Sequence, residues 1–220
     1  MPERVGTLPL SGKVGCSQRQ LKRIVMKHPL ERTPTTSRKP TFWAFLAGTL
    51  ILFAVFRVLD APLRTSAAPS GIVSFELAGT PSQAQAIIDS WHEMAYLLSS
   101  VAGEPVPGMV SRAYSFAAFG LGIDYLFMPV YATALALGIL LAAGRHKDWF
   151  TILGAWLGWG AYAAALFDAV ENYALARMLL MNQVWSPYPE VAACSASVKF
   201  VLLSLGLFYA LVGWVWPKKM

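Results

Sequence analysis

Residues 149–181 read WFTILGAWLGWGAYAAALFDAVENYALARMLLM, a stretch long and apolar enough to cross a lipid bilayer as one helix. Its second half carries two carboxylates and an amide, at Asp168, Glu171 and Asn172. These positions are spaced i, i+3 and i+4, so a helix places all three on one face. Ionisable groups inside a membrane helix mostly face the bundle interior or a water-filled cavity. The stretch therefore predicts a membrane helix with one inward-facing polar face.

The composition agrees with a membrane protein, because 56% of the 220 residues are hydrophobic and only 14% are charged. The two cysteines, Cys16 and Cys194, stand far apart and in different settings, which predicts neither a disulfide framework nor a zinc site. The three histidines all lie outside the apolar stretches, so paired intramembrane ligands for a haem are missing. We expect no metal and no other cofactor.

The first 40 residues are basic and rich in proline. They hold nine of the 18 lysines and arginines, together with five prolines, and little apolar periodicity. Residues 1–40 are predicted to be a disordered, basic cytoplasmic tail that contacts anionic lipid. A nucleic-acid partner is not expected, because this charge is not spread over a folded surface. A targeting peptide is the alternative, although no apolar signal core precedes Thr41, and Met26 is a second candidate start.

Residues 41–220 are predicted to form one transmembrane domain. The fold class is an all-α integral membrane protein, a four-transmembrane-helix bundle. Four stretches have the length and hydropathy of a span, and the segment 60–112 separates the first from the second. The predicted spans are residues 42–59, 113–142, 149–181 and 191–216.

The segment between the first two spans contains a predicted amphipathic helix. The string Thr80-Pro81-Ser82-Gln83 has the form of a helix start, with proline directly after the cap. Apolar residues then follow at helical spacing to about Leu98, which predicts an extracytoplasmic helix that lies on the membrane surface or caps the bundle. An exposed polar face explains its acidic residues and histidine better than a metal site; these are Asp89, His92 and Glu93. Residues 72–77 are expected to form a short extended piece.

The charge distribution predicts the orientation. The tail, the Arg145–Lys147 hairpin and the Lys218–Lys219 terminus are basic and fall on one side of a four-span model, whereas the other side is mostly acidic. The positive-inside rule therefore places both termini in the cytoplasm.

The membrane-embedded ionisable residues lie at one depth. At a rise of about 1.5 Å per residue, Asp124, Asp168, Glu171 and Lys199 fall within about one and a half turns of the same level. We expect them to form one polar cluster with Asn172 in the outer half of the bilayer. If all were ionised, the three acids and one lysine would carry two uncompensated negative charges, a state that low dielectric opposes without a proton or a bound cation.

Candidate supporting residues and close contacts surround this cluster. A small-residue row, Gly154, Gly158, Ala161 and Ala164, leads to Asp168 and predicts close approach of another helix. Four further polar side chains are candidate supporting residues: Tyr125, Tyr131, Tyr173 and Ser195. No residue is assigned a catalytic role. In the alternative reading, the cluster only fixes the register of the helices.

Three segments, FELAGTPSQAQAIIDSW (75–91), GIDYLFMPVY (122–131) and LFDAVENYAL (166–175), resemble recurring stretches of small, uncharacterised bacterial four-span membrane proteins. The pattern is GxDYLFxPxY followed by FDxxEN, and the likeness extends over about residues 75–211. It implies a location in the bacterial inner membrane and a shared role for Asp124, Asp168, Glu171 and Asn172. It implies no activity.

Three classes of function follow from these observations. A binding protein would use the acids for an ion, a proton or a small amphipathic ligand, and this is the reading that we favour. A structural or assembly subunit of a membrane complex would use them for packing, and a membrane-embedded lipid-modifying enzyme would use Asp168 or Glu171 as acid or base. Membrane lipids are the expected partners, and both homo- and hetero-oligomers remain open.

The orientation gives the first prediction. In a variant without native cysteines, a cysteine at Gly103 is expected to react with a membrane-impermeant maleimide added from outside, whereas a cysteine added after Lys218 reacts only once the membrane is opened. Labelling of both cysteines from the same side would contradict the four-span topology.

Overall fold

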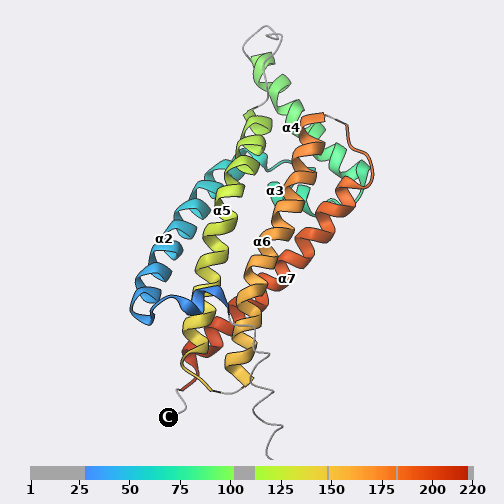
Figure 1. Ribbon diagram of the computed structural model, residues 1–220. Coiled ribbons are helices and arrows are strands. Elements are labelled where there is room, and N and C mark those ends of the chain that lie inside the picture. Colours follow the sequence, from blue (N-terminus) through green and yellow to red (C-terminus); the bar gives the residue numbers. More distant parts are fainter. Residues whose placement is uncertain (1–27, 102–111, 148, 182, 218–220) are drawn as a thin grey trace, which may run out of the picture.

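The computed structural model describes residues 28–101, 112–147, 149–181 and 183–217 (Figure 1). Within these ranges the chain is helical and contains no strand. Residues 1–27 of the predicted tail, including Met26, lie outside the described residues, as do the break between the outer helix and the second span and the terminal lysines. The helices are η1 (Pro29–Arg32), α2 (Thr35–Asp60), η2 (Ala61–Leu63), α3 (Ile72–Glu76), α4 (Pro81–Val101), α5 (Arg112–Ala143), α6 (Trp149–Met181) and α7 (Tyr188–Val215).

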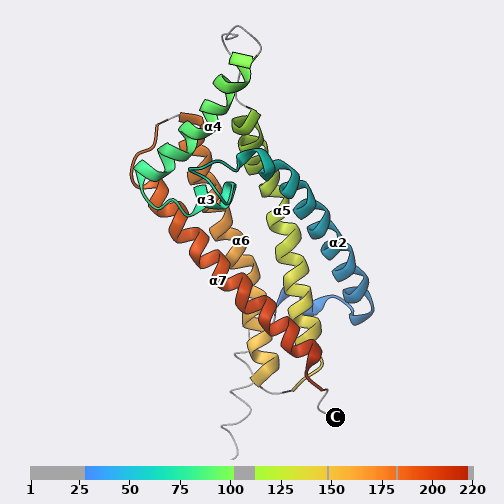
Figure 2. The same ribbon diagram turned by 180° about the vertical axis from the view of Figure 1, so that it is seen from behind.

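In this part of the chain, the four helices α2, α5, α6 and α7 are long and apolar enough to cross a membrane. Helices α5, α6 and α7 pack against one another, whereas α2 packs mainly on α5 (Figures 1 and 2). None of the residues in the most apolar window of α2 is buried, against 61% in α5. Helix α5 is therefore the centre of the bundle, and α2 is its most peripheral member.

Apolar side chains pack in three groups along the bundle. The largest joins α3 and α4 to the adjoining ends of α5 and α6 and contains Phe75, Trp91 and Leu175. A second group surrounds Met128, and a third surrounds Tyr209 at the far end. Along each long helix, the predicted polar residues lie between the first group and the second. The polar level therefore crosses an otherwise apolar core.

The small residues of α6 allow the close approach that the sequence predicts. A Cβ at Gly154 would lie 2.6 Å from Ala143 Cβ of α5 and 2.5 Å from the Tyr209 hydroxyl of α7. At Gly158 the nearest side chain is His28, 3.3 Å from the position of such a Cβ. His28 is 1% exposed, and its ring lies 5.1 Å from that of Trp159.

The predicted end of the disordered tail is therefore too late in the chain. His28 packs against Trp159 of α6, Pro29–Arg32 form η1, and α2 begins at Thr35, directly after Pro34. The prolines that suggested disorder instead occupy helix-start positions, at Pro29 and Pro34, where the fixed φ of proline fits. Pro40 lies within α2.

The prediction of a short extended piece at residues 72–77 is wrong, because this segment forms helix α3. The Asp60 carboxylate binds the start of α3 by accepting the Ile72 N–H at 2.8 Å, and it also pairs with Arg64 at 3.2 Å. Gly71 permits this geometry, since it has a φ of 61° and a Cβ there would collide with Asp60 Oδ1. The turn directs Glu76, the last residue of α3, toward the bundle.

Helix α4 covers one end of the bundle, at the top of Figure 1. It begins as predicted at Pro81, where the Thr80 hydroxyl accepts the Gln83 N–H at 3.4 Å. Its apolar face is buried, and the Trp91 indole donates to the Leu63 carbonyl oxygen at 2.8 Å. Gln85 on a polar face accepts the Val184 N–H at 3.1 Å. These contacts join α4 to both η2 and the connection before α7.

The two glycines Gly154 and Gly160 of α6 give a matched test of this packing. Gly154→Ala is expected to lower the melting temperature in detergent, since overpacking costs about 1–3 kcal/mol. Gly160→Ala is expected to leave it unchanged or raise it, because its Cβ would lie 3.9 Å from the nearest atom of Leu202 and alanine favours a helix by about 1 kcal/mol. Equal effects of the two substitutions would contradict the observed packing of α6 against α5 and α7.

Candidate functional site

The centre of the polar level is the ammonium group of Lys199 on α7. Its Nζ lies 2.9 Å from Asp168 Oδ1, 2.8 Å from Glu171 Oε2 and 3.8 Å from Glu76 Oε2. An ammonium has three protons, so three carboxylates can share them. Lys199 is 6% exposed and Glu171 is fully buried, which means that these charges interact away from bulk water. The group joins α3, α6 and α7.

Three hydrogen bonds join α6 to α5 at this level. The Tyr131 hydroxyl donates to Asp168 Oδ2 at 2.8 Å, so both oxygens of Asp168 have donors. The Asn172 amide donates to Asp124 Oδ2 at 2.8 Å and to the Leu121 carbonyl oxygen at 3.3 Å. The structure therefore brings together all five residues of the predicted polar cluster, with Tyr131. We call these residues and Glu76 the polar cluster.

Glu76 is the member of the polar cluster that sequence reasoning missed. Its position between the first two spans predicts one of the acids of the outer segment, yet its carboxyl group lies against Glu171 and Lys199. Burial raises the pKa of Glu76, while the Lys199 ammonium opposes this increase. The hydrophobic periodicity of the sequence does not indicate that Glu76 is buried. This residue reaches the bundle at the end of a five-residue helix, in the segment between the first two spans.

The supporting tyrosines separate by helical position. Tyr131 lies seven residues after Asp124, which is two turns along the same face, and it binds the cluster. Tyr125 and Tyr173 directly follow Asp124 and Asn172, so they point about 100° away and are 49% and 56% exposed. Both side chains therefore lie on a different face from the polar cluster. Ser195 is buried one turn before Lys199 on α7.

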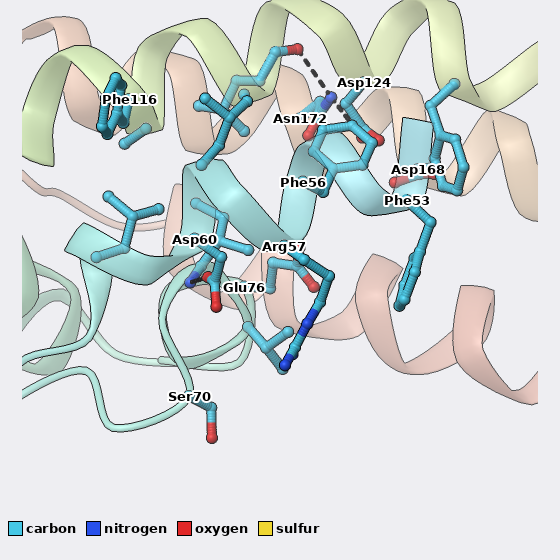
Figure 3. Close-up of a pocket in the computed structure, with 18 of the residues that line it drawn as sticks. Phe53, Phe56, Arg57, Asp60, Ser70, Glu76, Phe116, Asp124, Asp168 and Asn172 are labelled. Atoms are coloured by element: carbon cyan, nitrogen blue, oxygen red, sulfur yellow. Dashed lines mark hydrogen bonds between the residues drawn. The ribbon is translucent and has the colours of Figure 1, made fainter. Parts of the chain in front are cut away.

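A cavity of about 500 Å³ opens beside the polar cluster (Figure 3). Six members of the polar cluster line it. Four of them are charged side chains, Glu76, Asp124, Asp168 and Lys199, and the other two are Tyr131 and Asn172. The apolar lining comes from α2, α5 and α7 and is rich in phenylalanine: Phe53, Phe56, Phe116, Phe127 and Phe200. Arg57, Asp60 and Arg64 at the end of α2 also contribute. The cavity thus has charged, polar and aromatic parts.

Helix α2 completes this cavity without entering the core. The Phe56 ring of α2 meets the Phe127 ring of α5 edge to face, with centroids 5.2 Å apart. Phe53 precedes Phe56 by three residues, so both phenylalanines lie on the face of α2 that lines the cavity. Because α2 packs mainly on α5, the space between α2 and α7 remains open and forms part of the cavity.

The polar face of α4 has other contacts. Asp89 accepts a hydrogen bond from Gln85 Nε2 at 2.9 Å, and the His92 ring lies 5.1 Å from the Tyr114 ring. The side chain of Glu93 lies outside the described part of the structure. In that described part, no group of three or more histidine, cysteine, aspartate or glutamate side chains is arranged to hold a metal ion.

In comparisons with known proteins, no family model, curated protein or solved structure matches this chain. The resemblance to small bacterial four-span proteins therefore stays a prediction, and the geometry of the cavity and the polar cluster is the basis for a proposed function.

The shared ammonium predicts unequal effects of substitution within the polar cluster. Lys199→Met is expected to destabilise the protein by about 3–5 kcal/mol, because it leaves buried carboxylates without a cation. Asp124→Asn is expected to cost far less, since Asp124 has no ion pair with Lys199 and an asparagine oxygen still accepts from Asn172. Thermal unfolding of the purified protein measures both effects.

A double substitution tests the coupling directly. Glu171→Gln in the Lys199→Met background is expected to restore part of the lost stability, because it removes one of the orphaned charges. Arg177→Met, which removes an exposed cation of α6, is the control and is expected to have little effect. Strictly additive effects of Lys199→Met and Glu171→Gln would show that the two side chains do not form one network.

Proposed function

We propose that this chain is a multi-pass membrane protein that binds a small amphipathic ligand in the cavity beside its polar cluster. The observation that carries the proposal is the combination of about 500 Å³ of space, a charged floor and phenylalanine walls. Ligand sites of this size are typically apolar with a few polar groups that orient the ligand. An amphipathic molecule matches both parts of such a lining.

The setting of the cavity supports a ligand that comes from the membrane. The phenylalanines of α2 that line it belong to a helix long and apolar enough to span a bilayer, and α2 is the most peripheral of the four. A lipid-soluble molecule can therefore reach the cavity along α2, with its polar end directed to the polar cluster and its apolar part against the rings.

The proposed location is a bacterial inner membrane, with both termini in the cytoplasm and α4 on the outer side. The basic tail, hairpin and terminus support this orientation through the positive-inside rule. The start of α2 and the end of α7 lie at one end of the bundle, and α4 lies at the other (Figure 1). In this orientation the cavity lies in the outer half of the membrane.

A purely structural role accounts for part of the polar cluster. The ion pairs of Lys199 with Asp168 and Glu171 join α6 to α7 and fix their register. This role does not explain the cavity, because a network that served packing alone would be stabilised by apolar side chains filling the adjacent space. A binding role and a structural role are compatible, since the ion pairs of Lys199 fix the helix register while the residues that line the cavity can bind a ligand.

Two glycines of α5 give a matched test of ligand binding. A Cβ at Gly120 or Gly122 would meet no atom within 4 Å, but only Gly120 lines the cavity, whereas Gly122 lies on the exposed face of α5. The probes are three decyl chains that carry a photoreactive diazirine and end in an ammonium, a hydroxyl or a carboxylate. At least one is expected to label cavity residues saturably, and Gly120→Phe is expected to abolish this labelling by filling the space.

Gly122→Phe is the control, because it makes the same chemical change and gains the same helix propensity outside the cavity. It is expected to retain the labelling, and the melting temperatures of both variants show whether each is folded. If none of the three probes labels the cavity saturably, or if Gly120→Phe is labelled as strongly as Gly122→Phe, the proposed binding function is wrong.

A further inference from the structure

Asp124 is the carboxylate of the polar cluster that has no share in the Lys199 ion pairs. Lys199 Nζ lies within 4.0 Å of Asp168, Glu171 and Glu76, and no such ion pair reaches Asp124 in the described structure. The partner of Asp124 is the neutral amide of Asn172, at 2.8 Å (Figure 3). One cation among four cluster carboxylates leaves the floor of the cavity short of positive charge. A ligand that brings one positive charge to Asp124 reduces this imbalance.

The cavity walls also favour a cation. The faces of aromatic rings carry negative potential and attract ammonium groups within about 6 Å of the ring centroid. Lys199 shows that the site uses this interaction, because its Nζ lies 4.9 Å from the Phe200 ring centroid. Phe56 lines the same cavity as Asp124, so the lining offers a second ammonium both a carboxylate and an aromatic ring.

The two arginines that line the cavity, Arg57 and Arg64, have positions other than beside Asp124. Arg64 is paired with Asp60 at 3.2 Å, and Arg57 is exposed near the end of α2. In Figure 3, Arg57 lies toward Glu76 and Ser70 rather than beside Asp124. An anionic headgroup would be confined to this end, since deeper entry would place it against the cluster carboxylates.

A bare metal ion fits the lining less well than an organic cation. The described residues contain no group of three or more side chains arranged to ligate a metal, and the phenylalanine rings offer no oxygen or nitrogen ligands. The same rings are suitable partners for an alkyl chain, which makes dispersion contacts with them that a bare metal ion does not make.

We propose that the ligand is a lipophilic monocation, an aliphatic amine whose ammonium binds Asp124 and whose hydrocarbon chain packs against the phenylalanine walls. This inference rests on the proposed binding function and names the chemical class of its ligand. Asp124 is a specificity residue in this proposal, Asn172 orients its carboxylate, and the Lys199 network holds α6 and α7 in place on either side.

The three diazirine probes also test this inference, with the full-length protein in phosphatidylcholine nanodiscs. Untagged decylamine is expected to prevent labelling at a concentration at least about ten-fold lower than decanol, because a hydrogen bond between charged groups is worth about 1.5–3 kcal/mol. Asp124→Asn is expected to abolish this preference for the amine. Asp89→Asn, at an exposed position on α4 outside the cavity, is expected to retain it.

A second variant keeps the test decisive if Asp124→Asn does not fold. Phe56→Leu keeps an apolar wall but removes a ring face, so it is expected to weaken competition by decylamine more than competition by decanol. Equal competition by the amine, the alcohol and decanoate, or a preference for decanoate, would overturn the amine assignment and leave the binding function intact. Absence of saturable labelling by every probe would instead overturn both.

Discussion

The ion pairs of Lys199 are the interaction on which the arrangement of the bundle depends. A single ammonium on α7 is shared by Asp168 and Glu171 of α6 and by Glu76 at the end of α3. An ammonium or carboxylate in low dielectric is tolerated only with close partners, so the elements that supply these groups must keep their relative positions. The position of α3 follows in turn from Asp60, which binds its first residue, and from the positive φ of Gly71. A constraint inside the bundle is thus transmitted to the connection after α2.

This constraint explains why the bundle needs both very close and very loose packing. Gly154 lets α6 approach Ala143 and Tyr209, which sets the distances at which α6 and α7 exchange ion pairs further along. Helix α2 lacks such contacts with α6 and α7 and packs mainly on α5. The cavity lies between these two kinds of packing, with the closely packed helices α5, α6 and α7 on one side and α2 on the other. Space therefore exists beside the polar cluster because the helix that lines it is not tied to the cluster.

Much of this arrangement could be predicted from the sequence, because helical periodicity and the cost of intramembrane charge are strong signals. Asp124, Asp168, Glu171, Asn172 and Lys199 meet as their spacing and common depth predict, and the long helices follow the hydropathy. The errors occur where signals are weak. Glu76 and α3 lie in a short segment that a side-chain contact with Asp60 fixes at its start, and His28, in the segment predicted to be disordered, packs beside Gly158. Of the three candidate tyrosines, Tyr131 donates to Asp168, whereas Tyr125 and Tyr173 are exposed on other helical faces.

The polar cluster has two parts with different consequences. Asp168 accepts from both Lys199 and Tyr131, and Glu171 is fully buried against the ammonium, so these groups have their partners within the protein. Asp124 accepts from a neutral amide and faces the cavity, so its charge is available to a molecule that enters. A protein that used all of its acids for packing would leave none for recognition, and one that used none would have no fixed geometry around the ligand. Dividing the carboxylates between Lys199 and the cavity allows one cluster to fix the helices and to present a single acidic group at a defined position.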